Sequence, residues 1–158
     1  MNTKETNQTQ DDLFFPVGTL TIEVHDEQGN LKDVRKVKNT VVTSGKTFIA
    51  GSMIKTTTDT PTAMTHMGIG TGATAVNVAD TSLGTANGAR VTFSTAAATS
   101  TNTVTYVATF TSAYSGAITE AGVFNALTGG TMLCRTVFSA VNKTTSDTIT
   151  ITWTITVS

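Results

Sequence analysis

The side chains best suited to catalysis or metal binding are few in this sequence. Its only histidines are His25 and His66, and its only cysteine is Cys134. Two histidines without a nearby cysteine, and with a cluster of carboxylates only in the charged segment around His25, are a weak basis for a zinc site. A Ser/His/Asp or Cys/His arrangement would have to use one of the same two histidines. We therefore predict no metal, no cofactor and no catalytic group, and interpret His66 as a structural histidine and Cys134 as a buried small hydrophobe.

Two glycine-containing segments look superficially like phosphate-binding loops. Residues 68–72 (GIGTG) are followed by Ala-Thr-Ala, whereas a P-loop needs Lys and then Ser or Thr after its glycines. Residues 44–47 (SGKT) contain the tripeptide GKT, but Thr40 stands where the upstream glycine of a Walker loop would be. We interpret both segments as tight turns.

Glu120 is the one carboxylate deep in the strand-rich half of the chain, within residues 118–124 (ITEAGVF). After Ala89 the only other charged residues are Arg90, Arg135, Lys143 and Asp147. Burying a carboxylate unpaired costs several kcal/mol, so we expect a structural ion pair of Glu120 with an arginine, Arg135 before Arg90. A general-acid role would need a second carboxylate within reach, and this segment holds none.

Threonine dominates the composition, with 37 residues of 158, whereas charged residues make up only 13%. An ordinary soluble domain has about 25% charged residues. Threonine favours strands because its branched Cβ is stiff at χ1 and fits a pleated surface. A sheet protein with so little charge has little electrostatic repulsion to keep its copies apart. This composition indicates a protein that sits among identical neighbours in a durable assembly rather than a metabolic enzyme.

Length and charge exclude several classes of protein. A chain of 158 residues fits one domain with a single core. The net charge of −1 and the pI near 6.0 argue against a nucleic-acid partner, which favours a basic face. No apolar run approaches the ~20 residues of a membrane span, so no membrane partner is expected. Residues 1–12 are too polar for a signal or transit peptide, and nothing in the sequence demands export.

We interpret residues 1–16 as an N-terminal arm and residues 17–158 as a single β-domain. Residues 1–12 are too polar to bury anything, whereas Leu13, Phe14 and Phe15 form a large apolar group before a proline. These three residues either fold back on their own domain or fill a groove on a neighbouring subunit, where aromatic side chains act as hot spots. Our arm hypothesis assigns Leu13, Phe14 and Phe15 to a subunit interface.

The sequence at the start of the domain predicts a charged β-hairpin. Residues 19–24 (TLTIEV) alternate as a strand, residues 26–30 (DEQGN) are typical of a turn, and Leu31, Val34 and Val37 lie on the return strand. The basic residues of this segment are mixed with acidic ones. That mixture favours a solvated strand face over a phosphate-binding patch.

A single short helix is expected over residues 45–54, with Ser44 as its N-cap and with apolar residues at helical spacing. A threonine-rich loop over residues 55–61 follows, and then a short strand over residues 64–70. Residues 71–88 are rich in Gly, Ala and Asn and predict a loop with one helical turn near residues 80–83.

Five further strands are expected at the regular spacing of an all-β sandwich, over residues 90–96, 103–110, 117–124, 131–141 and 148–157. The last of them alternates throughout, with Ile149, Ile151, Trp153, Ile155 and Val157 against intervening threonines. We expect the apolar set to be buried, and we assign Thr150, Thr152 and Thr154 to a subunit interface. The predicted fold is an antiparallel β-sandwich, jelly-roll or immunoglobulin-like, with one short helix and an extended N-terminal arm.

Segments of the C-terminal part resemble small virion proteins of tailed bacteriophages. The matching pieces are residues 64–72 (MTHMGIGTG), 80–84 (DTSLG), 103–110 (TVTYVATF), 118–126 (ITEAGVFNA), 129–138 (GGTMLCRTVF) and 149–154 (ITITWT). The order of these segments is similar to that in modules associated with phage tail-collar and tail-fibre proteins. This resemblance implies a structural role. The chain stops at Ser158 without a repetitive shaft or a receptor-binding tip, so we expect a small piece that decorates or joins the particle.

The function that we expect is a non-enzymatic structural protein of the virion, made in the host cytoplasm. It assembles with itself as a symmetric oligomer and binds the major capsid or tail proteins. We favour a head-decoration (cement) protein that bridges capsid subunits, and the alternative is a tail, collar or tail-fibre adaptor. A carbohydrate-binding β-sandwich is an alternative of another class, but it would need a row of exposed aromatic residues.

Overall fold

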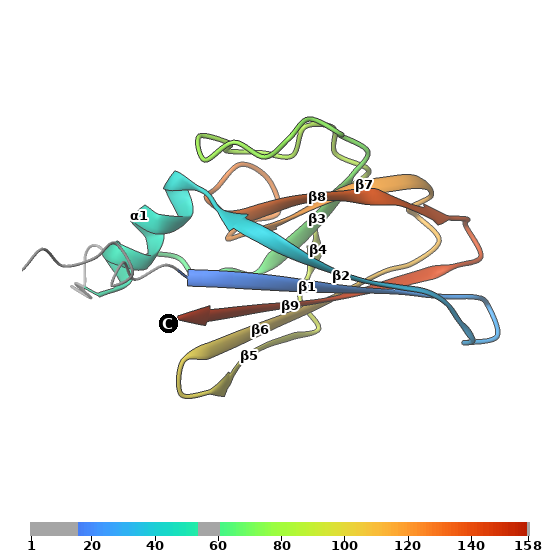
Figure 1. Ribbon diagram of the computed structural model, residues 1–158, viewed down its shortest axis with the longest axis horizontal. Coiled ribbons are helices and arrows are strands. Elements are labelled where there is room, and N and C mark those ends of the chain that lie inside the picture. The colour runs from blue at the N-terminus through green and yellow to red at the C-terminus, as the bar shows by residue number, and fades with distance from the viewer. Residues whose placement is uncertain (1–15, 54–60, 158) are drawn as a thin grey trace, which may run out of the picture.

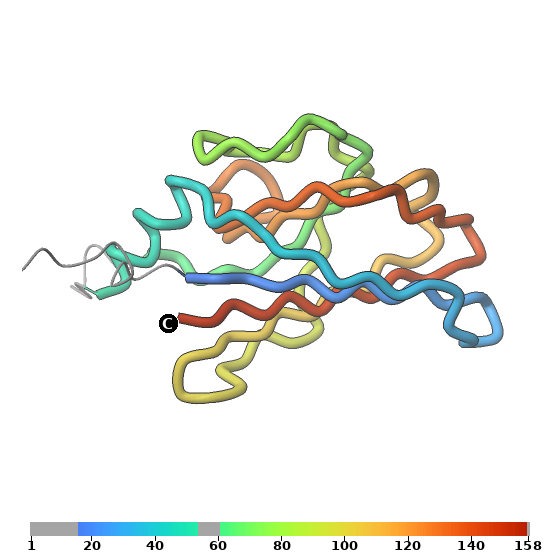
Figure 2. The backbone as a smooth tube through the Cα atoms, in the orientation of Figure 1, coloured from blue at the N-terminus to red at the C-terminus, as the bar shows by residue number. Residues whose placement is uncertain are grey.

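The computed structural model describes residues 16–53 and 61–157. These residues form one helix, α1 (Thr43–Ser52), and nine strands: β1 (Pro16–His25), β2 (Leu31–Val41), β3 (His66–Gly70), β4 (Val91–Thr92), β5 (Thr95–Ser100), β6 (Thr103–Phe110), β7 (Gly116–Phe124), β8 (Met132–Lys143) and β9 (Thr148–Val157). The backbone trace in Figure 2 shows the last strand returning to lie beside the first.

All nine strands belong to one antiparallel sheet, in the order β4-β3-β7-β8-β2-β1-β9-β6-β5. Strand β2 joins its two halves, because residues 31–39 pair with β1 whereas Thr40 and Val41 pair with β8. The sheet therefore curls into a half-barrel, with β3, β7 and β8 in one half and β1, β9, β6 and β5 in the other (Figure 1). The predicted antiparallel all-β fold with one short helix is confirmed. The finer prediction of a jelly-roll or immunoglobulin-like sandwich is not confirmed.

The β1–β2 hairpin forms where the sequence analysis placed it. The Asp26 carboxylate accepts hydrogen bonds from the backbone N–H groups of Gln28 and Asn30, at 3.0 and 2.8 Å. Gly29 takes a φ of 84°, which a residue with a Cβ adopts only at a cost. Short-range hydrogen bonding therefore fixes this turn, which explains why it is predictable from the sequence.

The core lies inside the curl, where both halves of the sheet contribute to one hydrophobic cluster. Strand β9 supplies Ile149, Ile151 and Trp153, all completely buried, while the alternate threonines face outward and are half-buried. The predicted alternation of this strand is confirmed for residues 149–155. Val157 is only half-buried, because it lies at the strand end opposite Pro16, the first residue of β1.

Helix α1 begins earlier than predicted and without the predicted cap. Val42 occupies the N-cap position with no side-chain hydrogen bond. Ser44 lies inside the first turn instead, and its hydroxyl donates to the carbonyl of Met132 on β8, 2.8 Å away. Gly45 packs so closely on the Leu133 backbone that a Cβ there would collide with it. Residues 44–47 are therefore helical, and our interpretation of them as a tight turn was wrong.

Three other segments differ from their predictions. The strand predicted over residues 90–96 is two strands, β4 and β5, which pair with β3 and β6 respectively. Residues 80–83 contain one bend, at Ser82, but no helical turn. Residues 68–70 belong to β3 rather than to a tight turn, and their glycines leave room for close neighbours instead of cradling a phosphate.

Candidate functional site

The outer face of β1, β9 and β6 is the most distinctive surface of the molecule. These three strands pair in register, so that Thr19, Thr154 and Thr105 form one row across the sheet and Thr21, Thr152 and Val107 form the next. We call this surface the threonine face. Its outward residues are Val17, Thr19, Thr21 and Glu23 of β1, Thr150, Thr152, Thr154 and Thr156 of β9, and Thr103, Thr105, Val107 and Thr109 of β6.

Hydroxyl groups hold part of this face together. Thr109 and Thr150 lie 3.3 Å apart, oxygen to oxygen, and so do Thr103 and Thr156. Glu23 is the only charged residue among the outward residues of these three strands. The next strand, β2, carries charged residues beside this face, namely Lys36 and Lys38. Such a face offers neighbours many hydroxyl groups and stiff side chains but almost no electrostatic repulsion.

No helix of the described part of the chain covers the threonine face. Helix α1 contacts β8, and Figure 1 shows it at one end of the molecule. The structure places Thr150, Thr152 and Thr154, which the sequence analysis assigned to an interface, together on this uncovered surface. The other predicted interface residues, Leu13, Phe14 and Phe15, lie outside the described residues.

The structure brings Glu120 and Arg135 together in a buried ion pair. Nη2 of Arg135 lies 2.7 Å from Oε2 of Glu120, and the two side chains are 2% and 0% exposed. The Glu120 carboxylate also accepts hydrogen bonds from the backbone N–H groups of Gly72, Gly84 and Thr85, at 2.7–3.0 Å. Its negative charge is thus compensated by a cation and by three backbone donors.

A second carboxylate, which the sequence analysis missed, completes this network. Asp80 accepts from Nη1 of Arg135 at 2.7 Å. A hydrogen bond from the Asn77 backbone N–H and, to a lesser extent, the contact with Arg135 outweigh the effect of burial and hold the pKa of Asp80 below its ordinary value. The glycines near Glu120 also have a role here, because a Cβ at Gly72 would collide with its carboxylate. We call Glu120, Arg135 and Asp80 the loop clamp, since together they fasten residues 71–85 onto β7 and β8.

A further buried charge network lies at the far end of the half-barrel. Asp147 is buried and pairs with Nζ of Lys32 at 2.7 Å, and this lysine together with hydrogen bonds from Thr144 lowers the pKa of Asp147. Lys143 is also buried and donates to the carbonyls of Tyr114 and Thr144, while burial lowers its pKa. These contacts join the β1–β2 hairpin to the β8–β9 turn. Their role in the fold is structural.

The residues first considered for chemistry are held in structural contacts. His66 is half-buried, with Nδ1 2.7 Å from the hydroxyl of Thr65 and Nε2 3.4 Å from that of Thr92. Cys134 is completely buried, and burial raises the pKa of its thiol, which disfavours the reactive thiolate. No group of three or more His, Cys, Asp or Glu side chains among residues 16–53 and 61–157 is arranged to hold a metal ion.

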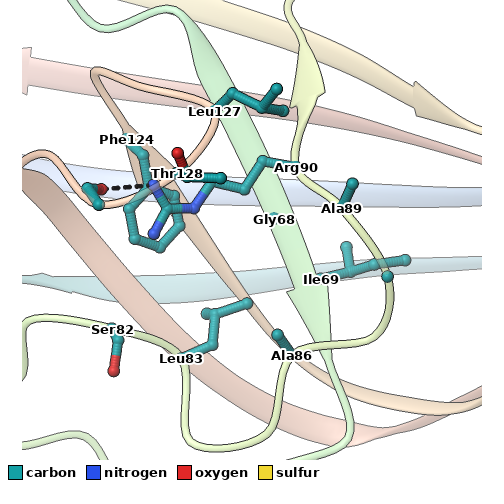
Figure 3. Close-up of a pocket in the computed structure, with 12 residues that line it drawn as sticks. Gly68, Ile69, Ser82, Leu83, Ala86, Ala89, Arg90, Phe124, Leu127 and Thr128 are labelled. Atoms are coloured by element: carbon teal, nitrogen blue, oxygen red, sulfur yellow. Dashed lines mark hydrogen bonds between the residues drawn. The ribbon is translucent and has the colours of Figure 1, made fainter.

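Arg90, the second possible partner of Glu120, lies elsewhere. Its guanidinium stacks on the ring of Phe124, 3.5 Å from the ring centre, and donates to the carbonyls of Ala126 and Gly129. Beside it is a cavity of about 400 Å³ on the outer side of β3 and β7 (Figure 3). Sequence reasoning missed this cavity because three separate segments build it, around residues 68, 83–90 and 124–129.

Comparison of the chain with protein-family models, curated proteins and solved structures found no match. No helix in the described part of the chain is long and apolar enough to cross a membrane.

Proposed function

We propose that this chain is a non-enzymatic structural protein of a tailed bacteriophage particle, which assembles as a symmetric oligomer and bridges capsid subunits as a head-decoration (cement) protein. The observation that carries this proposal is the threonine face, with Glu23 as its one charged residue on three adjacent strands. The solvent-exposed surface of a soluble domain usually carries many charges of both signs, which oppose association between copies. Their scarcity here favours a surface that is buried against a neighbour.

The energetics of threonine support the same conclusion. Its χ1 angle is already restricted in a strand, so a threonine loses little side-chain freedom when a neighbour covers it. Hydroxyl groups that now bond across strands, such as those of Thr109 and Thr150, retain lone pairs for donors on a partner. A lysine-rich face would lose far more entropy and hydration on the same burial.

Within this proposal the curled sheet is a variant of the jelly-roll or immunoglobulin-like sandwich, with its two halves joined through β2. Support comes from the core, where Trp153 and Ile151 of one half and Met67 and Val123 of the other belong to one cluster. Such β-domains are compact and durable building blocks for assemblies.

The structure gives less support to a carbohydrate-binding module. Such a site usually presents aromatic rings to the sugar, yet Trp153, Phe110 and Phe124 are completely buried. No aromatic residue is among the exposed large hydrophobic residues of the described part of the chain. A tail or collar adaptor would use the same self-associating face, so the copy number per particle separates it from a cement protein.

Thr152→Lys tests the threonine face. Thr152 lies in its centre, between Thr21 and Val107, and its side chain points away from the core. We expect the free energy of unfolding to change by no more than about 0.5 kcal/mol, as for other surface substitutions. Self-association and binding to particles should be lost, because a neighbour would have to bury the new ammonium group.

The matched control is Thr145→Lys, which adds the same charge at an exposed position of the β8–β9 turn. Oligomeric state by analytical ultracentrifugation and occupancy on purified particles provide the readouts. Thr152→Lys protein that associates and decorates particles as wild type does would rule out the threonine face as the interface.

Deleting residues 1–15 tests the arm. Under the arm hypothesis residues 1–15 contact a neighbouring subunit rather than their own domain, so we expect the melting temperature to stay close to that of the full chain. Incorporation into particles should fall, because Leu13, Phe14 and Phe15 no longer anchor the subunit. Ordering such a lead costs about 1–2 kcal/mol per residue, which only a substantial contact offsets. Quantitative mass spectrometry of particles measures the effect, and unchanged incorporation would refute the arm hypothesis.

A further inference from the structure

The cavity beside Arg90 lies on the outer side of β3 and β7, and among the described residues Ile69 is the one member of the main core cluster that lines it. Gly68 and Phe124 face it, whereas their neighbours Met67 and Val123 point into the core. Figure 3 shows the Arg90 side chain crossing the cavity above the Phe124 ring, with Leu83 and Leu127 on opposite sides. Leu127 is 52% exposed at the rim. The cavity thus combines apolar walls with one cation.

The charge of Arg90 has no carboxylate partner within the described part of the chain, where the ion pairs involve Lys32, Arg35 and Arg135. Its Nη1 donates to the carbonyls of Ala126 and Gly129, at 2.8 and 2.7 Å. The Arg90 side chain is half-buried, and this burial lowers its pKa. A half-buried guanidinium of this kind favours an additional carboxylate, which it binds through parallel hydrogen bonds.

The ligand that fits this cavity therefore carries a carboxylate next to a large apolar group. Residues 11–15 of the chain itself (DDLFF) have this chemistry. Asp11 and Asp12 are the only acidic residues of the sequence within three positions of an aromatic residue. In an extended segment Asp12 and Phe14 point to the same side, about 7 Å apart. That spacing allows the Asp12 carboxylate to contact Arg90 while the Phe14 ring enters the apolar part of the cavity.

The arm of the same copy is too short to place Phe14 there. Phe14 is two positions from Pro16, which gives the chain a reach of about 7 Å. Near the start of β1, Gly18 pairs with Asn39 of β2. Two residues further along β2, Val41 pairs with Cys134 of β8, which pairs with Val123 of β7, next to Phe124. These three steps of about 4.8 Å each amount to about 14 Å along the sheet. The cavity also opens on the convex side of the curl, which lengthens the path.

We infer that the cavity beside Arg90 receives residues 11–15 of a second copy of this chain, with Asp12 on the Arg90 guanidinium and Phe14 against Phe124 and Leu83. This inference rests on the proposed self-assembly and names the docking site of the arm. Two interactions then hold adjacent subunits together: the burial of the Phe14 ring and the charge-assisted hydrogen bonds between Asp12 and Arg90.

A charge exchange between full-length variants tests the inference. Arg90→Glu and the double variant Asp11→Lys/Asp12→Lys should each weaken self-association at least tenfold, because like charges then meet at the cavity. An equimolar mixture of the two should regain wild-type association. In the mixture the reversed arm meets the reversed cavity, and the native arm meets the native cavity. Sedimentation velocity and native mass spectrometry provide the readouts.

The arm variant changes no residue of the described domain, so it remains informative even if Arg90→Glu fails to fold. Glu27→Lys, on the exposed hairpin turn, controls for net charge. A wild-type protein that stays monomeric, single variants that associate normally, or a mixture that does not recover would each overturn the inference. If the arm variant still enters particles normally, the docking site is wrong while the proposed function stands. If the wild-type chain is missing from particles, the proposed function fails independently.

Discussion

Replacing Trp153 with alanine is expected to destabilise the domain by about 3–5 kcal/mol. Trp153 is completely buried in the centre of β9, between Leu20 of β1 and Tyr106 of β6. Both halves of the half-barrel pack in the cluster to which it belongs, so alanine would leave a cavity where they meet. Since a domain is stable by only about 5–15 kcal/mol, a large part of the protein should unfold at physiological temperature.

Two further substitutions sharpen this prediction. The Trp153 indole N–H is buried without a hydrogen-bond partner in the described part of the chain, so Trp153→Phe removes an unpaired donor and should cost much less than alanine. Thr154→Ala, on the opposite face of the same strand, should change the free energy of unfolding by about 0.5 kcal/mol or less. Urea denaturation measures all three, and a loss below about 1 kcal/mol for Trp153→Ala would contradict the assigned core.

Replacing Glu120 with alanine is expected to cost a similar amount, about 3–5 kcal/mol, for a different reason. The substitution leaves the Arg135 guanidinium buried with only Asp80 as a carboxylate partner. It also removes the acceptor for the backbone N–H groups of Gly72, Gly84 and Thr85. The Arg135 guanidinium thus loses part of its charge compensation, and the three N–H groups lose their carboxylate acceptor, and both losses are costly for buried groups.

Asp80→Ala is the matched comparison, because Asp80 contacts the same guanidinium but is 25% exposed. Its cost should be clearly smaller than that of Glu120→Ala. Hydrogen exchange should also show faster exchange in residues 71–85 for both variants, since the loop clamp fastens that segment. A Glu120→Ala variant that keeps wild-type stability but loses a measurable hydrolytic or binding activity would contradict the structural role of Glu120 and the non-enzymatic proposal together.

The elements that the sequence predicts well are those governed by local patterns. Strand β9 occupies the predicted residues 148–157, because its strict alternation permits only one orientation of Trp153. The β1–β2 turn follows from Asp26 and Gly29, which act within a few residues of each other. The pairing of Glu120 with Arg135 was also a reasonable expectation, since few charges are available in that half of the chain.

The features that the sequence does not reveal depend on contacts between distant segments. The Ser44 hydroxyl has the right chemistry for an N-cap, but it donates its hydrogen bond to the carbonyl of Met132, and the helix begins two residues earlier than predicted. Asp80 meets Arg135 across 55 positions of sequence. The Arg90 cavity likewise requires the register of β3 with β7, which no local pattern encodes.

Locating the protein in the electron cryomicroscopy density of intact phage particles tests the central claim most directly. The account predicts symmetric copies on the head surface, in the hundreds per particle, with the threonine face against a neighbouring subunit. A few copies in the tail would contradict the decoration role and favour an adaptor. Absence of the protein from purified particles would contradict the claim that this chain is a structural component of the virion.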